Sequence, residues 1–160
     1  GTAKVMGRMV SLAHLWNTVR VQGGAYGTGM ILRDIGFAGF FSYRDPSAAR
    51  TLDCCRASAD FLRGIAETDL TGMIIGAAAE SEPLLTARMK GKTADARYWR
   101  QITHDDLCRV RREMLSATPD DLTALADSVG ELAAQGAVCV LGPRQQVDAC
   151  AEWLDSVLVL

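Results

Sequence analysis

The stretch VRVQGGAYGTGM at residues 19–30 decides the fold, because the spacing of apolar residues changes across it. Before it, over residues 3–21, apolar side chains recur every three or four positions, which predicts an α-helix with one buried stripe. The members of that stripe are Val5, Met9, Leu12, Trp16 and Val19. Gly23 and Gly24 end the helix, since glycine readily adopts the left-handed conformation found there. After the stretch, β-branched and aromatic residues at 28–43 predict an antiparallel hairpin that turns at residues 34–36.

The remainder of the chain is mostly helical in pattern. Asp45-Pro46 predicts the start of a helix whose buried positions are Leu52, Cys55, Ala59, Leu62 and Ala66. Asp69 predicts the cap of a helix that runs to residue 79. A loop is expected over 81–92, followed by a helix at 94–101, and Thr103 and Thr118 each open a capping-box pattern. Residues 137–141 predict a short buried strand, and residues 144–156 a last helix.

These elements predict an α+β fold, a small antiparallel sheet covered by helices on one face, in a single domain over residues 1–160. Three strands are few for a free-standing sheet, so we expect a first strand to be missing. The chain opens Gly1-Thr2-Ala3-Lys4 without an initiator methionine. We therefore expect it to be a piece of a longer protein.

Composition excludes several classes of protein. With 160 residues, 49% hydrophobic and 22% charged, the chain is too apolar for disorder, and a net charge of −2 gives no pull toward nucleic acid or a membrane surface. The arginines at 109–112 lie on a predicted helix where Asp105 and Glu113 can pair with Arg109. The apolar run at 73–79 is too short to span a bilayer. Five cysteines without a C-x-x-C spacing suggest reduced thiols and a cytoplasmic location.

The sequence gives no sign of a metal site or of a nucleophile. His14 and His104 are far apart and belong to no metal-binding motif, and the adjacent Cys54 and Cys55 diverge on a helix. We therefore expect no metal ligand and no cofactor bound by this chain. There is no G-x-S-x-G elbow, and the cysteines, which also include Cys108, Cys139 and Cys150, are interpreted as small apolar residues.

The glycine cluster at 23–29 ends a helix and opens a strand, the reverse of a phosphate-binding loop. Arg20 lies in the last turn of the helix, and Tyr26 follows a turn made flexible by Gly23, Gly24 and Gly27. A guanidinium and a phenol at such a turn are suitable donors to peptide carbonyls or to a developing oxyanion. The alternative is that Arg20 only complements the helix dipole while Tyr26 packs on the sheet.

Two blocks carry a family resemblance: LWNTVRVQGGAYG at 15–27 and FSYRDP at 41–46. Shorter similarities follow in order at residues 51–53, 61–62, 74–76, 90–91, 111–115 and 138–142. Together they resemble the C-terminal half of the presequence-protease branch of the pitrilysin/insulinase zinc metallopeptidases.

The resemblance implies a clamshell of two homologous halves, each with two α+β domains of the pitrilysin and mitochondrial-processing-peptidase type. The zinc and the catalytic glutamate, on an H-x-x-E-H motif, would belong to the N-terminal half, and this chain would be the fourth domain. An arginine and a tyrosine of the C-terminal half reach the active site in such enzymes. The matching residues here are Arg20 and Tyr26.

The expected function is therefore that of the C-terminal, substrate-enclosing domain of a zinc-dependent metalloendopeptidase that cleaves oligopeptides in a closed chamber. Its expected partners are the N-terminal half of the same polypeptide and the peptide substrate, and the isolated chain is expected to be inactive. The superfamily also has non-catalytic members, so a structural or peptide-binding subunit is an alternative. An independent cytosolic binding module is a second alternative. The presence or absence of an H-x-x-E-H motif in upstream sequence would discriminate the metalloendopeptidase from the non-catalytic subunit.

Overall fold

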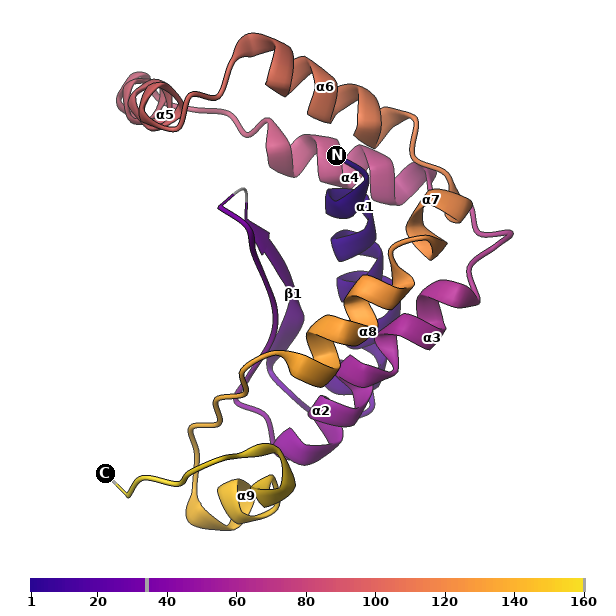
Figure 1. Ribbon diagram of the computed structural model, residues 1–160, viewed down its shortest axis with the longest axis vertical. Coiled ribbons are helices and arrows are strands. Elements are labelled where there is room, and N and C mark those ends of the chain that lie inside the picture. Colours follow the sequence, from indigo (N-terminus) through magenta and orange to yellow (C-terminus); the bar gives the residue numbers. More distant parts are fainter. Residues whose placement is uncertain (34, 160) are drawn as a thin grey trace.

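A long N-terminal helix and a two-stranded hairpin form the inner part of the molecule in the computed structural model, which describes residues 1–33 and 35–159. The helix begins as α1 (Thr2–Met9) and continues as η1 (Val10–Val21), and the hairpin is β1 (Gly27–Arg33) with β2 (Phe37–Tyr43). The strands pair antiparallel, from Gly27 opposite Tyr43 to Arg33 opposite Phe37. In Figure 1 the helices of the described chain lie on one side of the hairpin. This confirms the predicted α+β class; of the predicted turn at 34–36, residue 34 lies outside the described residues.

The second half of the long helix is a π-helix, which the sequence pattern did not predict. The hydroxyls of Ser11 and Thr18 and the amide of Asn17 each donate to a carbonyl four residues earlier, at 2.7, 3.0 and 2.9 Å. Such bonds compete with the backbone donors of an α-helix and favour the wider turn. At the helix end, the amide of Gln22 donates to the carbonyl of Asn17, five residues before it.

The wider turn changes which residues are buried. Val10, Leu15 and Val19, spaced by five and four positions, are buried on this helix. Leu12 and Trp16 are more than a third exposed, so their predicted place in the core is wrong. The predicted stripe of apolar residues assumes 3.6 residues per turn. In a helix with more residues per turn, successive members of that stripe no longer face the core.

The helices α2 (Ala48–Arg56), α3 (Ser58–Arg63) and α4 (Thr71–Ser81) follow the hairpin. Asp45 accepts from the amide of Ser47 and the hydroxyl of Thr51, at 2.9 and 2.6 Å. Its predicted place as the N-cap is wrong, because α2 begins two residues later, with Ser47 at the N-cap. Asp69 likewise accepts from the amide and the hydroxyl of Thr71. Ala66 is exposed, against prediction, because α3 has already ended.

Two capping boxes are confirmed. Thr103 begins α6 (His104–Leu115), and Thr118 begins α7 (Pro119–Thr123), which is followed by α8 (Ala126–Gln135). In each box the threonine hydroxyl accepts from the backbone of an aspartate three residues later, and that aspartate accepts in return. These local hydrogen bonds are readable from sequence because they need no distant partner.

The predicted loop over 81–92 is wrong in its second half. Helix α5 (Ala87–Trp99) begins where the hydroxyl of Thr86 accepts from the amide of Met89 at 3.4 Å. Pro83 precedes this helix and Gly91 lies within it. Glycine lowers helix propensity but does not forbid a helix, so its use as a loop marker was misleading here.

The C-terminal segment also differs from prediction. Residues 137–141 form no strand, because within the described chain no strand edge pairs with them. The last predicted helix is reduced to α9 (Arg144–Asp148) and the short 3-10 turn η2 (Ala151–Trp153). The chain turns there and places the ring of Trp153 3.4 Å from the guanidinium carbon of Arg56 on α2.

The core lies between the long helix and the surrounding helices. Its fully buried side chains include Val5, Leu15, Leu62, Met114 and Leu122, which come from α1, η1, α3, α6 and α7. The partly buried Met30, Leu32 and Phe40 add the covered face of the hairpin. The core therefore holds the end of η1 and the start of β1 in fixed positions.

Candidate functional site

The turn between η1 and β1 is the first candidate site. Gly24 has a φ of +80°, and a Cβ added to Gly23 would lie 2.4 Å from the carbonyl oxygen of Val19. Both positions therefore require glycine. Gly27 is the first residue of β1, and a Cβ there would meet no atom within 4 Å. Two of the three predicted turn glycines are thus explained by backbone geometry.

Arg20 is held in place by two contacts. Its Nε donates to the carbonyl oxygen of Tyr26 at 3.1 Å. Its guanidinium carbon lies 3.9 Å from the ring centroid of Trp16, one turn earlier on η1, within the range of a cation–π contact. The two Nη groups make no hydrogen bond to any described residue. These Nη groups are therefore available as donors.

Tyr26 lies on the surface of the turn. Its side chain is among the exposed aromatics, at 66%, and its ring meets that of Tyr43 edge-on at 6.0 Å. The guanidinium carbon of Arg44 is 5.6 Å from the Tyr26 ring centroid. The structure thus joins Arg20 to Tyr26 through the tyrosine carbonyl, while the largely exposed Tyr26 ring contacts the sheet at Tyr43, as the alternative expects.

The alternative role of Arg20 also has structural support. Arg20 is the basic residue in the last turn of η1, and its carbonyl accepts from the amide of Gly24 at 3.0 Å. A cation at this position interacts favourably with the helix dipole. The dipole role uses the net charge of Arg20, whereas the donor role uses its Nη groups, so the two are compatible.

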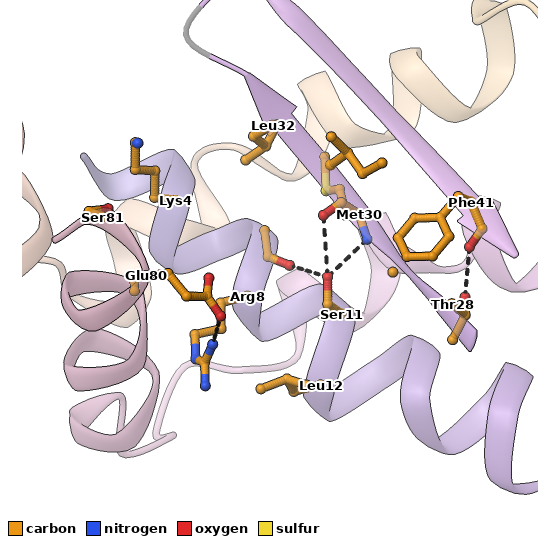
Figure 2. A pocket seen from close by; sticks show the side chains of 14 residues that line it. Lys4, Arg8, Ser11, Leu12, Thr28, Met30, Leu32, Phe41, Glu80 and Ser81 are labelled. Atoms are coloured by element: carbon orange, nitrogen blue, oxygen red, sulfur yellow. Dashed lines mark hydrogen bonds and ion pairs between the residues drawn. The ribbon is translucent and has the colours of Figure 1, made fainter. Parts of the chain in front are cut away.

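A cavity of about 470 Å³ lies between α1, η1, β1 and α4, and begins at Thr28, two residues after Tyr26 (Figure 2). The hydroxyl of Ser11 accepts from the amide of Met30 at 2.9 Å, so a helix side chain satisfies this backbone donor of β1. The hydroxyl of Thr28 donates to the carbonyl of Phe41 at 3.0 Å. The wall therefore combines hydroxyl groups with the apolar Leu12 and Phe41.

An ion pair lies at the edge of this cavity. Arg8 of α1 pairs with Glu80 of α4, and Figure 2 shows the two side chains pointing toward one another. A Cβ added to Gly76 would lie 2.1 Å from Nε of Arg8. Gly76 is thus the position on α4 that makes room for the guanidinium.

On α6, Nε2 of His104 lies 3.3 Å from Sγ of Cys108 one turn later, in an exposed contact between neighbours on one helix, and neither residue lines the cavity. Nε2 of His14 lies 2.9 Å from the carbonyl oxygen of Cys54, and the ring stacks on Phe61. Burial raises the pKa of the Cys55 thiol to about 12. Over residues 1–33 and 35–159, no group of three or more His, Cys, Asp or Glu could hold a metal ion.

The basic stretch on α6 is largely paired. Arg109 pairs with Glu113 at 3.0 Å and with Asp106 at 3.4 Å, so the predicted pairing with Asp105 is replaced by the neighbouring aspartate. Arg111 pairs with Glu82, and this contact holds the pKa of the glutamate below its ordinary value. Among the described helices, none is long and apolar enough to cross a membrane.

Sequence reasoning missed two residues around the turn. Trp16 was assigned to the core, yet it supports the guanidinium of Arg20. Arg44 has a φ of +48°, which is unusual for a residue other than glycine, and contacts Tyr26 and Tyr43. Trp16 lies four residues before Arg20 on one helix, and this spacing could have predicted the contact between their side chains.

Comparisons with known proteins agree on one family. The family described as the PreP C-terminal domain matches residues 1–141. Presequence protease 1, chloroplastic/mitochondrial, of Arabidopsis thaliana is 31% identical over 153 residues, which are 93% of this chain and 14% of that protein. Protein HypA of Clostridium perfringens is 30% identical over 149 residues, 92% of this chain and 15% of that protein. The mitochondrial presequence protease of Drosophila melanogaster is 28% identical over 158 residues, 96% of this chain and 15% of that protein.

This chain thus spans about a seventh of the length of these relatives. It belongs to the PreP C-terminal domain family.

Proposed function

We propose that residues 1–160 are the fourth, C-terminal domain of a longer zinc-dependent metalloendopeptidase of the pitrilysin/insulinase superfamily. The domain would help enclose oligopeptide substrates, together with the N-terminal half of the same polypeptide. Membership of the PreP C-terminal domain family and relatives named presequence proteases support the proposal. The five free cysteines favour a reducing compartment such as the cytoplasm.

Arg20 and Tyr26 would bind the substrate backbone and stabilise the transition state. The observation that carries this role is the fixed guanidinium of Arg20, held by Trp16 and the Tyr26 carbonyl while its Nη groups have no partner among the described residues. A donor already oriented before the reaction stabilises developing negative charge without reorganisation, and losing one typically costs about 10²–10³ in rate.

The described residues do not fit a zinc site. His14 is engaged with a backbone carbonyl, and no cluster of three metal-binding side chains is found in the described chain. We therefore propose that zinc is a cofactor of the full-length enzyme and belongs to another part of the polypeptide.

The proposed division of labour has a physical advantage. Donors on one half reach the reacting peptide only when the two halves close, so closure excludes water and completes the site together. A chamber that must close also limits the substrate to peptides small enough to be enclosed.

Tyr26→Phe in the full-length enzyme tests the proposal, with Tyr43→Phe as the matched control. Removing the Tyr26 hydroxyl is expected to lower kcat by about 10²–10³-fold. The Tyr43 variant removes a neighbouring hydroxyl from the same surface. It is expected to keep wild-type turnover, because the proposal gives this hydroxyl no role in the reaction. Zinc content, measured by metal analysis, is expected to be unchanged in both. Equal turnover in the two variants would refute the role of Tyr26, and a full-length protein that hydrolyses no peptide would favour the non-catalytic alternative.

A further inference from the structure

Helix α5 packs little against the rest of the described chain. None of its 13 residues is buried, and in Figure 1 it stands apart from the other helices at the end of two connecting segments. Its aromatic side chains Tyr98 and Trp99 are 70% and 79% exposed. Most helical stability in proteins comes from packing, and isolated helices of this length are marginal in water.

Local interactions do not replace the missing packing. Arg88 and Lys90 place positive charge in the first turn, where the helix dipole disfavours it, and no acidic residue is present there. Arg88 and Lys92 are like charges one turn apart. Gly91 lowers the helix propensity in the middle of the segment. The stability of α5 must therefore come from a contact outside the described chain.

The charge of α5 identifies the chemistry of that contact. Residues 86–101 carry five cations and one carboxylate, a net charge of +4, whereas the whole chain carries −2, so the remaining residues carry −6. The cations are Arg88, Lys90, Lys92, Arg97 and Arg100. No ion pair joins any of them to another residue in the described part of the chain, whereas Arg63, Arg109 and Arg111 are all paired.

The distribution of these charges favours a protein partner. Arg88 and Lys90 lie about 200° apart around the helix, so the cations form no single stripe that could follow a phosphate backbone. Because cations occupy opposite sides of the helix, it also has no apolar face that could enter a bilayer. Exposed tyrosine, tryptophan, methionine and arginine are the residues enriched at protein interfaces, and α5 carries all four, with Met89 47% exposed.

We propose that α5 is a docking element that binds an acidic surface on the part of the longer polypeptide outside this chain. This inference rests on the proposed function, in which the chain is one domain of such a polypeptide. The relatives leave ample length for the partner surface, because the matched region is only 14–15% of each. The cations would pair across the interface, and Tyr98 and Trp99 would supply its apolar contact.

Hydrogen exchange in the full-length protein tests the docking. Amides of residues 87–99 are expected to exchange at least about tenfold more slowly in the full-length protein than in a synthetic peptide of residues 86–101. Lys90→Glu with Lys92→Glu is expected to remove most of this protection. Glutamate at position 90, in the first turn, interacts favourably with the helix dipole, and glutamate at position 92 has about the helix propensity of lysine, so a loss of protection is not a propensity effect. Arg112→Glu, a charge reversal at an exposed site on α6, is the control and is expected to leave the protection within about twofold.

Exchange at the peptide's rate in the full-length protein would overturn the proposal, as would protection that survives the double reversal. Protection that arises only after addition of a 20-nucleotide single-stranded DNA or of phosphatidylserine vesicles would also overturn it, in favour of those partners. Peptide hydrolysis is measured on the same samples. Absent hydrolysis with intact protection of α5 contradicts the peptidase function alone, whereas normal hydrolysis with an unprotected α5 contradicts the docking alone.

Discussion

Trp16→Ala tests whether the indole holds Arg20 in a working position. The ring centroid lies 3.9 Å from the guanidinium carbon, and Trp16 is 39% exposed. A cation–π contact at an exposed site contributes about 0.5–1 kcal/mol. Since 1.4 kcal/mol is a factor of ten, losing the contact is expected to lower kcat/KM for peptide hydrolysis by the full-length enzyme about two- to fivefold. Trp16→Phe keeps an aromatic face and is expected to restore most of the loss.

The same change in an Arg20→Ala background separates positioning from a general loss of structure. If Trp16 acts through Arg20, Trp16→Ala is expected to have no further effect once the guanidinium is gone. An equal loss in both backgrounds would refute the reasoning. Thermal unfolding of each variant controls for stability, and little change is expected because the indole lies at the surface.

Three further predictions concern the fold. Gly24→Ala forces a φ of +80° on a residue with a Cβ and is expected to cost about 1–2 kcal/mol in urea unfolding, whereas Gly27→Ala stays near wild type. Thr118→Ala is expected to cost about 1 kcal/mol, because the hydroxyl caps α7. Burial raises the pKa of the Cys55 thiol from 9.0 to about 12, so the unfolded state loses its proton first and stability falls as pH rises above 9.0. Cys55→Ala is expected to reduce this alkaline loss in unfolding measurements, and an unchanged pH profile would contradict the assignment.

The parts of the fold that sequence predicted are those set by local chemistry. The capping boxes at Thr103 and Thr118 and the change from helix to hairpin at Gly23 and Gly24 each depend on residues within a few positions. The strand predicted at 137–141 depended on a distant pairing partner, and the described chain provides none. A short apolar run does not determine its own pairing.

The sequence pointed to Arg20 and Tyr26 as candidate residues, but it did not predict the geometry around them. The contact between Trp16 and the Arg20 guanidinium was not predicted, because the apolar stripe was assigned with the period of an α-helix and placed Trp16 in the core. Side-chain bonds to carbonyls from Ser11, Asn17 and Thr18 accompany the π-helix, and their effect on helix period is not visible in a hydrophobic pattern. The cavity beside Thr28 depends on tertiary contacts between α1, η1, β1 and α4, so no sequence signal marks it.

The role of Arg20 is tested most directly by kcat/KM for peptide hydrolysis by the full-length enzyme carrying Arg20→Ala. If the Nη groups of Arg20 stabilise the transition state, this variant is expected to lose about 10²–10³ in kcat/KM with zinc content unchanged. Arg112→Ala, which removes an exposed arginine from α6, is expected to keep wild-type activity. An Arg20→Ala enzyme that hydrolyses peptides within about twofold of wild type would contradict the role of Arg20 as a transition-state donor, since losing such a donor costs far more than that.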